Sequence, residues 1–552
     1  MKVIDSKILD SNFDEFSKSP ELDYNLAYAA VHGLSRDTSK LHINDCSLHR
    51  RINRGTTLAV ALALKEYIER EFPDHERIGV GLPSCFPGVA LNLAIIMAGK
   101  SSVNVNFTMG ADAARGGLER IGLKCIIGSN KVREKVAERS PDFPWTDDFR
   151  DIGEILKSLG KKAILPKLLA VKTLPASAII KYYKIPTTGG NKEASIIFTS
   201  GSEGAPKAAM LSHRNLMTNI LQFRNIGIIT EKSVLHANLP LFHSFGQTIQ
   251  IWFSAIDGVP QVAVQSPLEI LANINAIRDG GSTLMISTPT FLRSYFKRAT
   301  AEDFEHLEVV IAGAEKTPEG FDEAWEAKFP KTHYLEGYGL TEMSPVVSTN
   351  LPEGLVRGKF CPQPSRIKRT SVGELFPGMQ AAVASPETGE LLPLGETGLL
   401  FLKGGNAFLG YYNQPEENAK RFVDGWVNTG DLAQLDSDGF IFIKGRLARF
   451  SKIGGEMVPH TTVENAIVKA LGLQDSEKVA VAIGSRPDES KGEVLVLLST
   501  VDIDMSALRQ KLTAAGLSNL WIPKTVVKIG EIPVLGSGKL DLAKIQKICK
   551  FS

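Results

Sequence analysis

The chain has 552 residues, a net charge of +2, 43% hydrophobic residues and 22% charged residues. This length exceeds one compact core and predicts about three or four folding units, while the composition is that of a soluble globular protein. The balanced charge gives no argument for nucleic acid as a partner. The five cysteines are scattered and none lies in a CxxC pair, which argues against a disulfide framework or a zinc site and fits a reducing compartment.

The N-terminal residues carry interleaved acids without an apolar core, so we expect no signal peptide. The longest apolar stretch, residues 86–98, is shorter than the roughly 20 residues of a membrane span. Together with the cysteine pattern, these features predict a cytoplasmic protein.

The first predicted elements alternate between helix and strand. Apolar residues at helical spacing predict amphipathic helices, and short apolar runs predict buried strands between them. This alternation implies right-handed crossovers and a parallel, doubly wound sheet. The expected helices lie at 56–70, 89–98 and 111–121, and the expected strands at 78–82, 103–105 and 125–127.

Residues 153–184 mix apolar residues with seven lysines. A basic amphipathic stretch of this kind can touch anionic lipid or an acidic protein. The alternative is a solvated helical connection, which the sequence alone favours.

A candidate phosphate-binding loop lies within residues 196–215. The apolar run 196–198 predicts a buried strand, a loop of small residues leads to Lys207, and a helix is expected after it. Glycines allow the backbone to approach an anion closely, and Lys207 adds a positive charge. The loop is not a Walker A motif, because Pro206 stands where that motif needs glycine. On composition alone, an ordinary Gly/Ser-rich surface turn has even odds.

The alternation resumes after residue 196, with strands expected at 234–238, 284–287 and 309–312. Short β-runs from 371 to 444 predict a small barrel or meander. The expected fold class is α/β. A large N-terminal region would hold two doubly wound β/α subdomains and a small β-barrel, followed by a smaller α/β domain. The expected boundaries are 1–445 for the N-terminal region, with its β-rich subdomain from about 371, 446–449 for the junction and 450–552 for the C-terminal domain.

Four further motifs follow the loop in a fixed order. They are Gly313-Ala314-Glu315, the segment 336–342 (EGYGLTE), Thr429-Gly430-Asp431 followed by Gly445-Arg446, and Gly536-Ser537-Gly538-Lys539. In this order and spacing, the motifs resemble those of the adenylate-forming, AMP-binding superfamily. That superfamily includes acyl-CoA synthetases, acyl carrier protein synthetases, luciferases and peptide-synthetase adenylation domains. The resemblance covers nearly the whole chain.

The resemblance implies a two-step reaction. A carboxylate attacks the α-phosphate of ATP to give an acyl-adenylate and pyrophosphate, and a phosphopantetheine thiol then displaces AMP. Mg²⁺ is implied as the metal, with Glu342 as its ligand. Thr341, Glu342 and Lys539 are implied as catalytic residues, with Thr341 and Lys539 at the α-phosphate. The nucleotide-binding residues implied are Thr199, Ser200, Gly201, Ser202, Glu203, Gly204 and Lys207 at the phosphates, and Gly313, Ala314, Glu315, Tyr338, Gly339, Asp431 and Arg446 at adenine and ribose.

The superfamily also rotates its C-terminal domain between adenylation and thiol transfer. The resemblance places the hinge at residues 446–449, with Arg449 at the pivot. Lys452 and Gly455 would lie beside the thiol channel. We therefore expect the C-terminal domain to be mobile.

Several departures from the general pattern mark a subfamily. Glu203 stands where many members have Thr, and the runs 103–108 and 449–458 are also distinctive. These features resemble the synthetase part of bacterial acyl-[acyl carrier protein] synthetase/2-acylglycerophosphoethanolamine acyltransferase and long-chain fatty acyl-CoA synthetases. Ala208 replaces the usual glycine after Lys207, which we expect to be mild if its φ stays negative.

The acyl site is expected around Phe242 and His243. The segment lacks the Asp that anchors an amino acid's ammonium, which suits a fatty acyl chain. For His243, a gate and a packed core histidine are left as equal alternatives.

The expected partners are a fatty acid and a phosphopantetheine thiol, with acyl carrier protein favoured over coenzyme A by the resemblance. No nucleic acid is expected, and residues 153–184 offer peripheral contact with the inner membrane face. A non-catalytic nucleotide-binding scaffold is the alternative from another class. Retention of Lys207, Glu342, Asp431 and Lys539 together argues against it. The sequence gives no prediction of acyl chain length or oligomeric state.

Overall fold

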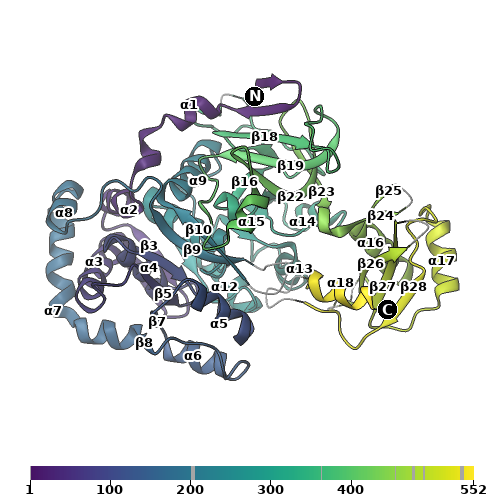
Figure 1. Cartoon of the computed structure of the whole chain (residues 1–552). Coiled ribbons are helices and arrows are strands. Elements are labelled where there is room, and N and C mark those ends of the chain that lie inside the picture. Colours follow the sequence, from purple (N-terminus) through teal and green to yellow (C-terminus); the bar gives the residue numbers. More distant parts are fainter. Residues whose placement is uncertain are drawn as a thin grey trace.

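The computed structural model describes residues 2–199, 206–361, 363–453, 456–474, 476, 479–488, 492–534 and 540–551. Four sheets organise this part of the chain (Figure 1). Three of them form the large N-terminal region, and the fourth forms a smaller α/β unit at one side of the molecule. This is the α/β class that the sequence predicts.

The first sheet is mostly parallel and carries the candidate phosphate loop at its edge. Its central strands pair in parallel through β5, β6, β7, β8 and β9. The sheet order is β20 (Gly410–Tyr411), β10 (Lys207–Ser212), β9 (Glu193–Thr199), β6 (Ser101–Asn104), β5 (Arg77–Gly81), β7 (Cys125–Gly128) and β8 (Asp148–Asp151). Helix α3 (Arg54–Glu71) precedes the first of these strands, and the helices between them are α4 (Phe86–Met97), α5 (Ala111–Arg120), α6 (Asn130–Ala137), α7 (Ile152–Thr173) and α8 (Ala176–Tyr182). Each predicted helix and strand of residues 56–127 is thus confirmed within a few residues.

Strand β10 corrects the prediction of a helix directly after Lys207. Residues Lys207–Ser212 pair antiparallel with β9, and Ala208, Ala209 and Leu211 are fully buried in the hairpin. The helix begins only at His213, where the Ser212 hydroxyl accepts from the backbone N–H of Asn215 at 3.1 Å and caps α9 (His213–Ile226). The capping residue therefore sets the boundary that the apolar pattern leaves open.

The second sheet has nine strands and is parallel through its centre. Its C-terminal strand ends face the segments that carry the candidate nucleotide motifs. The order is β17 (Glu374–Leu375), β16 (Val346–Thr349), β15 (His333–Gly339), β14 (Val309–Ala312), β13 (Leu284–Ser287), β11 (Leu235–Ala237), β12 (Gln261–Ala263), β3 (Leu41–Asp45) and β4 (Arg50–Asn53). Its neighbouring helices include α2 (Leu26–Ser35), α12 (Ile270–Gly280), α13 (Pro289–Arg298) and α14 (Phe321–Lys328).

The third sheet is antiparallel and corresponds to the predicted β-rich subdomain. It also takes in two N-terminal strands, because β2 pairs with β18. The strands are β1 (Lys2–Asp5), β2 (Ile8–Ser11), β18 (Met379–Ala384), β19 (Thr397–Gly404), β22 (Trp426–Leu435) and β21 (Phe422–Val423), with β23 (Ile441–Arg446) on β22. One apolar core, with members such as Ile197, Ile286 and Val383, joins the three N-terminal sheets.

The fourth sheet lies after β23 and has its own apolar cores, with members such as Val463 and Ile545. Its strands are β25 (Glu456–Pro459), β24 (Phe450–Ile453), β27 (Gly492–Ser499) and β26 (Val481–Asp488), with β28 (Thr525–Lys528) on β27. Its helices are α16 (His460–Leu471), α17 (Met505–Ala514) and α18 (Leu542–Lys550). The exact boundary at 446–449 and the mobility of this unit stay predictions.

No helix of the described residues is both long and apolar enough to cross a membrane.

Buried neutral histidines make the fold sensitive to acid. Burial lowers the pKa of His236 to about 4, and its Nε2 lies 2.8 Å from the Asn273 side-chain oxygen. Nδ1 of the same ring has no hydrogen-bond partner among the described residues, so a second proton there would be unpaired. Between the ordinary histidine pKa and about 4, only the unfolded chain binds this proton, and stability therefore falls as pH falls. The same direction holds for three further buried histidines: His42, His213 and His460.

The His236→Asn variant should lose stability less steeply on acidification than the native protein. Because one titrating site is removed, its free energy of unfolding should fall by about 1.4 kcal/mol less per pH unit between about pH 6 and pH 5. Urea unfolding at several pH values measures this slope. His306→Asn, at an exposed position, is the control and should keep the native slope. Equal slopes for the native protein and His236→Asn would show that the ring is not neutral in the fold.

Candidate active site

The candidate phosphate loop joins the two strands of the β9–β10 hairpin. Thr199 ends β9, Lys207 begins β10, and the two residues are direct partners in the antiparallel register. The backbone of Ala208 is that of a strand with negative φ, as the prediction of a mild substitution requires. Five loop residues of the prediction lie outside the described residues: Ser200, Gly201, Ser202, Glu203 and Gly204.

Lys207 contacts residues of β20 and of the helix that follows it. Its ammonium forms an ion pair with Glu417 on α15 (Pro415–Arg421) and lies 5.2 Å from the centroid of the Tyr411 ring. The hydrogen bond from Lys207, followed by that from Lys420, lowers the pKa of the Glu417 carboxyl to about 2. Glu417 is therefore charged at neutral pH. It forms an ion pair with Lys207, the residue that the resemblance implies as a phosphate ligand.

Glu342 lies in the 3₁₀ turn Thr341–Met343, directly after β15, and only 6% of it is exposed. Its Oε1 accepts hydrogen bonds from the Tyr411 hydroxyl and, at 3.1 Å, from Nη2 of Arg421. Among the described residues, no donor contacts Oε2. The carboxylate is thus oriented through one of its two oxygens.

Arg421 ties this carboxylate to the strand that carries the candidate ribose site. Its Nε donates to the Tyr411 hydroxyl at 3.1 Å and its Nη1 donates to the carbonyl of Asn428 at 2.6 Å. Asn428 in turn accepts from the backbone N–H of Gly430 at 3.0 Å, one residue before Asp431. A continuous set of contacts therefore runs from Lys207 through Glu342 to Asp431.

Asp431 lies on β22 and is 4% exposed. The Tyr338 hydroxyl donates to its Oδ2, and Arg446, its direct partner across β22 and β23, lies with Nε 3.3 Å from Oδ1. Burial raises the pKa of Asp431, although Arg446 and the Tyr338 hydroxyl lower it. Burial and the neighbouring Asp431 raise the pKa of Tyr338, so its hydroxyl stays a donor. The structure brings these three predicted residues together.

The other predicted nucleotide residues line the ends of β14 and β15. Gly313 and Ala314 follow β14, and Ala314 has a φ of 68°, a left-handed conformation uncommon for a residue with a side chain. The Glu315 carboxylate accepts from the Thr290 hydroxyl at 2.6 Å. At Gly339 a Cβ would lie 2.3 Å from the Pro345 carbonyl oxygen, so only glycine fits there.

The predicted acyl segment adjoins Thr341, because the Ser244 hydroxyl lies 3.2 Å from the Thr341 hydroxyl. Phe242 packs edge-on against Phe107, with ring centroids 5.2 Å apart. His243 is exposed, so the alternative of a packed core histidine is wrong, and its role as a gate stays a prediction.

Arg449 and Lys452, predicted at the hinge and the thiol channel, form ion pairs with different parts of the fold. Arg449 forms an ion pair with Glu464 on α16, and the Glu464 Oε1 accepts from the backbone N–H of Ile483 at 2.7 Å. Lys452 forms an ion pair with Glu387, which lies between β18 and β19 of the third sheet. Gly455 and Lys539 lie outside the described residues.

Three residues of this site were not predicted from the sequence: Tyr411, Glu417 and Arg421. The available signal was the spacing of Glu417 and Arg421, since residues four apart share one face of a helix. The helix itself is short, and its partners are far away in the sequence. Nothing local therefore indicates which charges this face meets.

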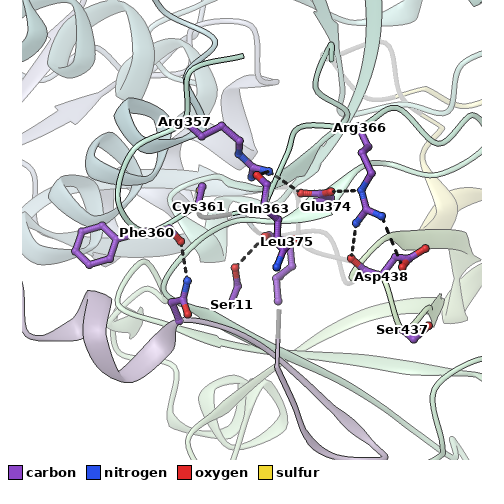
Figure 2. A pocket seen from close by; sticks show the side chains of 11 residues that line it. Ser11, Arg357, Phe360, Cys361, Gln363, Arg366, Glu374, Leu375, Ser437 and Asp438 are labelled. Atoms are coloured by element: carbon purple, nitrogen blue, oxygen red, sulfur yellow. Dashed lines mark hydrogen bonds and ion pairs between the residues drawn. The ribbon is translucent and has the colours of Figure 1, made fainter. Parts of the chain in front are cut away.

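A separate cavity of about 220 Å³ lies between the N-terminal strands and the segment 357–375. Figure 2 shows its polar lining, in which Arg357 contacts Glu374 at 3.0 Å, while Arg366 contacts Glu374 at 3.3 Å and Asp438 at 3.7 Å. These charges are already paired with one another. No residue of the predicted site lines this cavity.

The lysine at the β9–β10 hairpin, the buried carboxylate after β15 and the Asp–Arg pair at the third sheet lie where the resemblance to the adenylate-forming superfamily leads us to expect them. The chain belongs to the family described as AMP-binding enzyme, whose model matches residues 58–412. The relatives below, to which the chain is similar, are named as acyl- and aryl-CoA ligases.

Three curated relatives carry ligase names. The chain is 28% identical over 306 residues to 4-coumarate–CoA ligase 3 of Oryza sativa subsp. japonica, a match that spans 54% of the chain and 53% of that protein's length. It is 27% identical to the long-chain-fatty-acid–CoA ligase of Salmonella typhimurium, over 70% of the chain and 67% of that protein. It is 24% identical to the mitochondrial medium-chain acyl-CoA ligase ACSF2 of Mus musculus, over 92% of the chain and 83% of that protein.

Solved structures share the fold. ATP-bound MatB from Rhodopseudomonas palustris aligns with a TM-score of 0.75 and 23% identity, covering 95% of the chain and 99% of MatB. The Bacillus subtilis o-succinylbenzoate coenzyme A synthetase MenE, in complex with ATP and magnesium ion, aligns with a TM-score of 0.73 and 19% identity, covering 95% of the chain and 99% of MenE. At these identities the likeness shows the fold.

Proposed function

We propose that this protein activates a fatty acid with ATP to an acyl-adenylate and then transfers the acyl group to the phosphopantetheine thiol of acyl carrier protein. Coenzyme A is the alternative thiol. The observation that supports the proposal is the continuous contact path from Lys207 through Tyr411, Glu342 and Arg421 to the residue before Asp431. This path joins the three groups that we propose bind ATP. Localisation in this proposal is cytoplasmic, with peripheral contact at the inner membrane face through residues 153–184.

In the first step, a carboxylate oxygen of the fatty acid attacks the α-phosphorus and pyrophosphate leaves. Loop residues 199–207 would hold the β- and γ-phosphates, with Lys207 as the cation among them. Asp431 would accept from the ribose hydroxyls, with Arg446 beside it. Thr341 and Lys539 would contact the α-phosphate, where negative charge develops.

The Glu342 carboxylate is suited to a magnesium ion. Mg²⁺ bound with a nucleotide needs one or two carboxylates and otherwise takes phosphate oxygens and water. Glu342 offers Oε2, while Arg421 and Tyr411 fix the orientation of the group through Oε1. The ion, when bound, would neutralise phosphate charge during the attack.

In the second step, the thiolate attacks the acyl carbonyl carbon and AMP leaves with the bonding electrons. We place the pivot for the preceding domain rotation at Arg449 and the thiol path near Lys452 and Gly455. The Lys452–Glu387 ion pair bridges the C-terminal unit and the third sheet, so rotation would break it. Because both partners are more than half exposed, this pair is an inexpensive contact to break.

Fatty-acid-dependent AMP formation, run with holo acyl carrier protein and separately with coenzyme A, tests the substrate and the thiol. We expect AMP and a thioester with a long-chain acid, and faster turnover with the carrier protein. Turnover with coenzyme A only would reverse the choice of thiol. No AMP with any medium- or long-chain acid would contradict the fatty-acid assignment and favour the non-catalytic scaffold. AMP release that ignores both thiols would indicate a non-thiol acceptor.

The Glu417→Gln variant should bind ATP more tightly than the native enzyme. Lys207 must leave its ion pair with Glu417 to reach a phosphate, and the charge-neutral glutamine competes less well for it. We expect the KM for ATP to fall about 3- to 10-fold with little change in kcat. Steady-state kinetics with varied ATP measures this. Glu416→Gln, at the exposed neighbouring position, serves as the control, and an equal or higher KM in Glu417→Gln would contradict a competing role.

A further inference from the structure

Helices α7 and α8 lie along the outer edge of the molecule, opposite the C-terminal unit (Figure 1). Their inner faces are anchored in the fold. Ile152 and Ile155 join the core beneath α3, and Val171 and Ile179 join the main core. Lys167, itself buried, forms an ion pair with Glu66 on α3 at 2.7 Å. The two helices are therefore held firmly and present one face outward.

That outward face carries large apolar side chains without cover. Leu165 and Leu169 are 56% and 64% exposed, and Leu174 and Tyr182 are 42% and 75% exposed. Leu165 and Leu169 are four residues apart and so lie on the same side of α7. Single exposed leucines are ordinary, but four large apolar residues exposed within 18 positions of the chain need an explanation.

Lysines alternate along the chain with these apolar residues. Residues 153–184 contain seven lysines and one acidic residue, Glu154, although the whole chain is nearly neutral. Only Lys167 is buried, whereas the others are exposed on α7, α8 and the turns beside them: Lys157, Lys161, Lys162, Lys172, Lys181 and Lys184. The acidic neighbours on α3, Glu66 and Glu69, are paired with Lys167 and Lys65. Helices α7 and α8 therefore expose a strongly basic surface that also carries uncovered apolar side chains.

This arrangement fits an anionic bilayer better than an acidic protein. Interfacial helices place leucine and aromatic side chains at the headgroup boundary, while lysines around them meet lipid phosphates. A protein partner is matched less well, because lysine is depleted in protein–protein interfaces, whereas lysines beside exposed leucine and aromatic side chains are typical of membrane-surface helices. The sequence alone favoured a solvated connection, but a solvated helix has no use for an exposed apolar stripe.

We propose that the outward face of α7 and α8 binds the surface of a membrane rich in anionic lipid. Leu165, Leu169 and Tyr182 enter the headgroup region, and the lysines contact lipid phosphates. The benefit for catalysis rests on the proposed function, since a long-chain fatty acid partitions into a bilayer and would reach the enzyme there. The lipid contact itself does not depend on that function.

Co-sedimentation of the full-length protein with vesicles tests the contact, in the absence of ATP and fatty acid. Vesicles of phosphatidylcholine with about 30% phosphatidylglycerol should bind the protein at about 0.1 M salt, and binding should weaken as salt rises. Vesicles of phosphatidylcholine alone should bind it at least about tenfold more weakly. Equal binding to both vesicles, or no binding to either, would overturn the proposal.

Two variants separate the apolar and the basic contributions. Leu165→Ser/Leu169→Ser and Lys161→Gln/Lys162→Gln/Lys172→Gln should each weaken binding to the anionic vesicles about tenfold or more. Leu268→Ser/Leu271→Ser is the matched control, because these leucines are 72% and 65% exposed near the start of α12, away from the lysines. The proposal fails if the Leu165→Ser/Leu169→Ser variant binds anionic vesicles as well as the control variant does. It also fails if the native protein binds acyl carrier protein but does not bind the anionic vesicles.

Activity assays distinguish a failure of the membrane-binding proposal from a failure of the proposed enzymatic function. Both variants should retain native turnover with a fatty acid supplied in solution and lose turnover selectively when the acid is supplied in anionic vesicles. If the proposed reaction is wrong, activity is missing in every assay while vesicle binding persists. Native turnover by both variants with vesicle-supplied acid would remove the link between the surface and the substrate.

Discussion

Replacing Lys539 by alanine should abolish adenylation while sparing the second half-reaction. The lysine is assigned to the α-phosphate and the bridging oxygen, where negative charge develops as the fatty acid attacks. Loss of one such fixed charge or donor typically lowers the rate by about 10²- to 10³-fold. Thioester formation from supplied acyl-adenylate involves no attack on phosphorus, so it should proceed at close to the native rate.

Single-turnover measurements of each half-reaction make this comparison directly. The first follows pyrophosphate release with ATP and fatty acid, and the second follows AMP release from acyl-adenylate and thiol. Lys547→Ala, at an exposed position on α18, is the control for general effects on the C-terminal unit. An equal loss in both half-reactions would refute the role assigned to Lys539.

The Arg421→Met variant should lose both activity and stability. Arg421 contacts Glu342, Tyr411 and Asn428 through its three nitrogens, and its removal leaves the buried Glu342 carboxylate without a cation. Breaking a buried ion pair from one side costs about 3 kcal/mol. Because Glu342 would also lose its fixed orientation, we expect kcat/KM for AMP formation to fall about 10²-fold.

Two further variants test whether the lost contacts of Arg421 cause the loss of activity in Arg421→Met. Arg421→Lys keeps the charge but cannot make three contacts in fixed directions, so its activity should be intermediate. Lys420→Met changes the neighbouring residue, which is 67% exposed and points to Glu417, and should remain within about twofold of the native enzyme. An Arg421→Met enzyme with native kcat/KM would show that Glu342 is oriented by other means or is not used.

The order of strands and helices could be predicted because each central strand is a short apolar run. Strands β5, β7, β13 and β14 are largely buried, and such runs stand out between amphipathic helices. Strand β10 could not be separated from the helix after it, because small buried residues suit either structure. The pairing of β2 with β18 joins segments far apart in the sequence, and no local pattern indicates it.

Part of the candidate site could likewise be predicted from the sequence, and part of it could not. Asp431 and Arg446 were expected together from their motifs, and the β22–β23 register makes them direct partners. The contacts of Lys207 and Glu342 could not be expected, because α15 and Tyr411 approach them only through the folding of three sheets. Ion pairs between distant segments follow from tertiary packing, and the spacing of charges within one short helix does not reveal them.

Fatty-acid-dependent exchange of pyrophosphate into ATP, measured without any thiol, tests the central claim most directly. Exchange requires reversible attack of a carboxylate on the α-phosphate, which is the step that Lys207, Glu342 and Asp431 are proposed to support. We expect exchange that needs both Mg²⁺ and a long-chain fatty acid. The absence of exchange with every acid tested, or ADP and phosphate as the products of ATP, would contradict the assignment of an adenylation site.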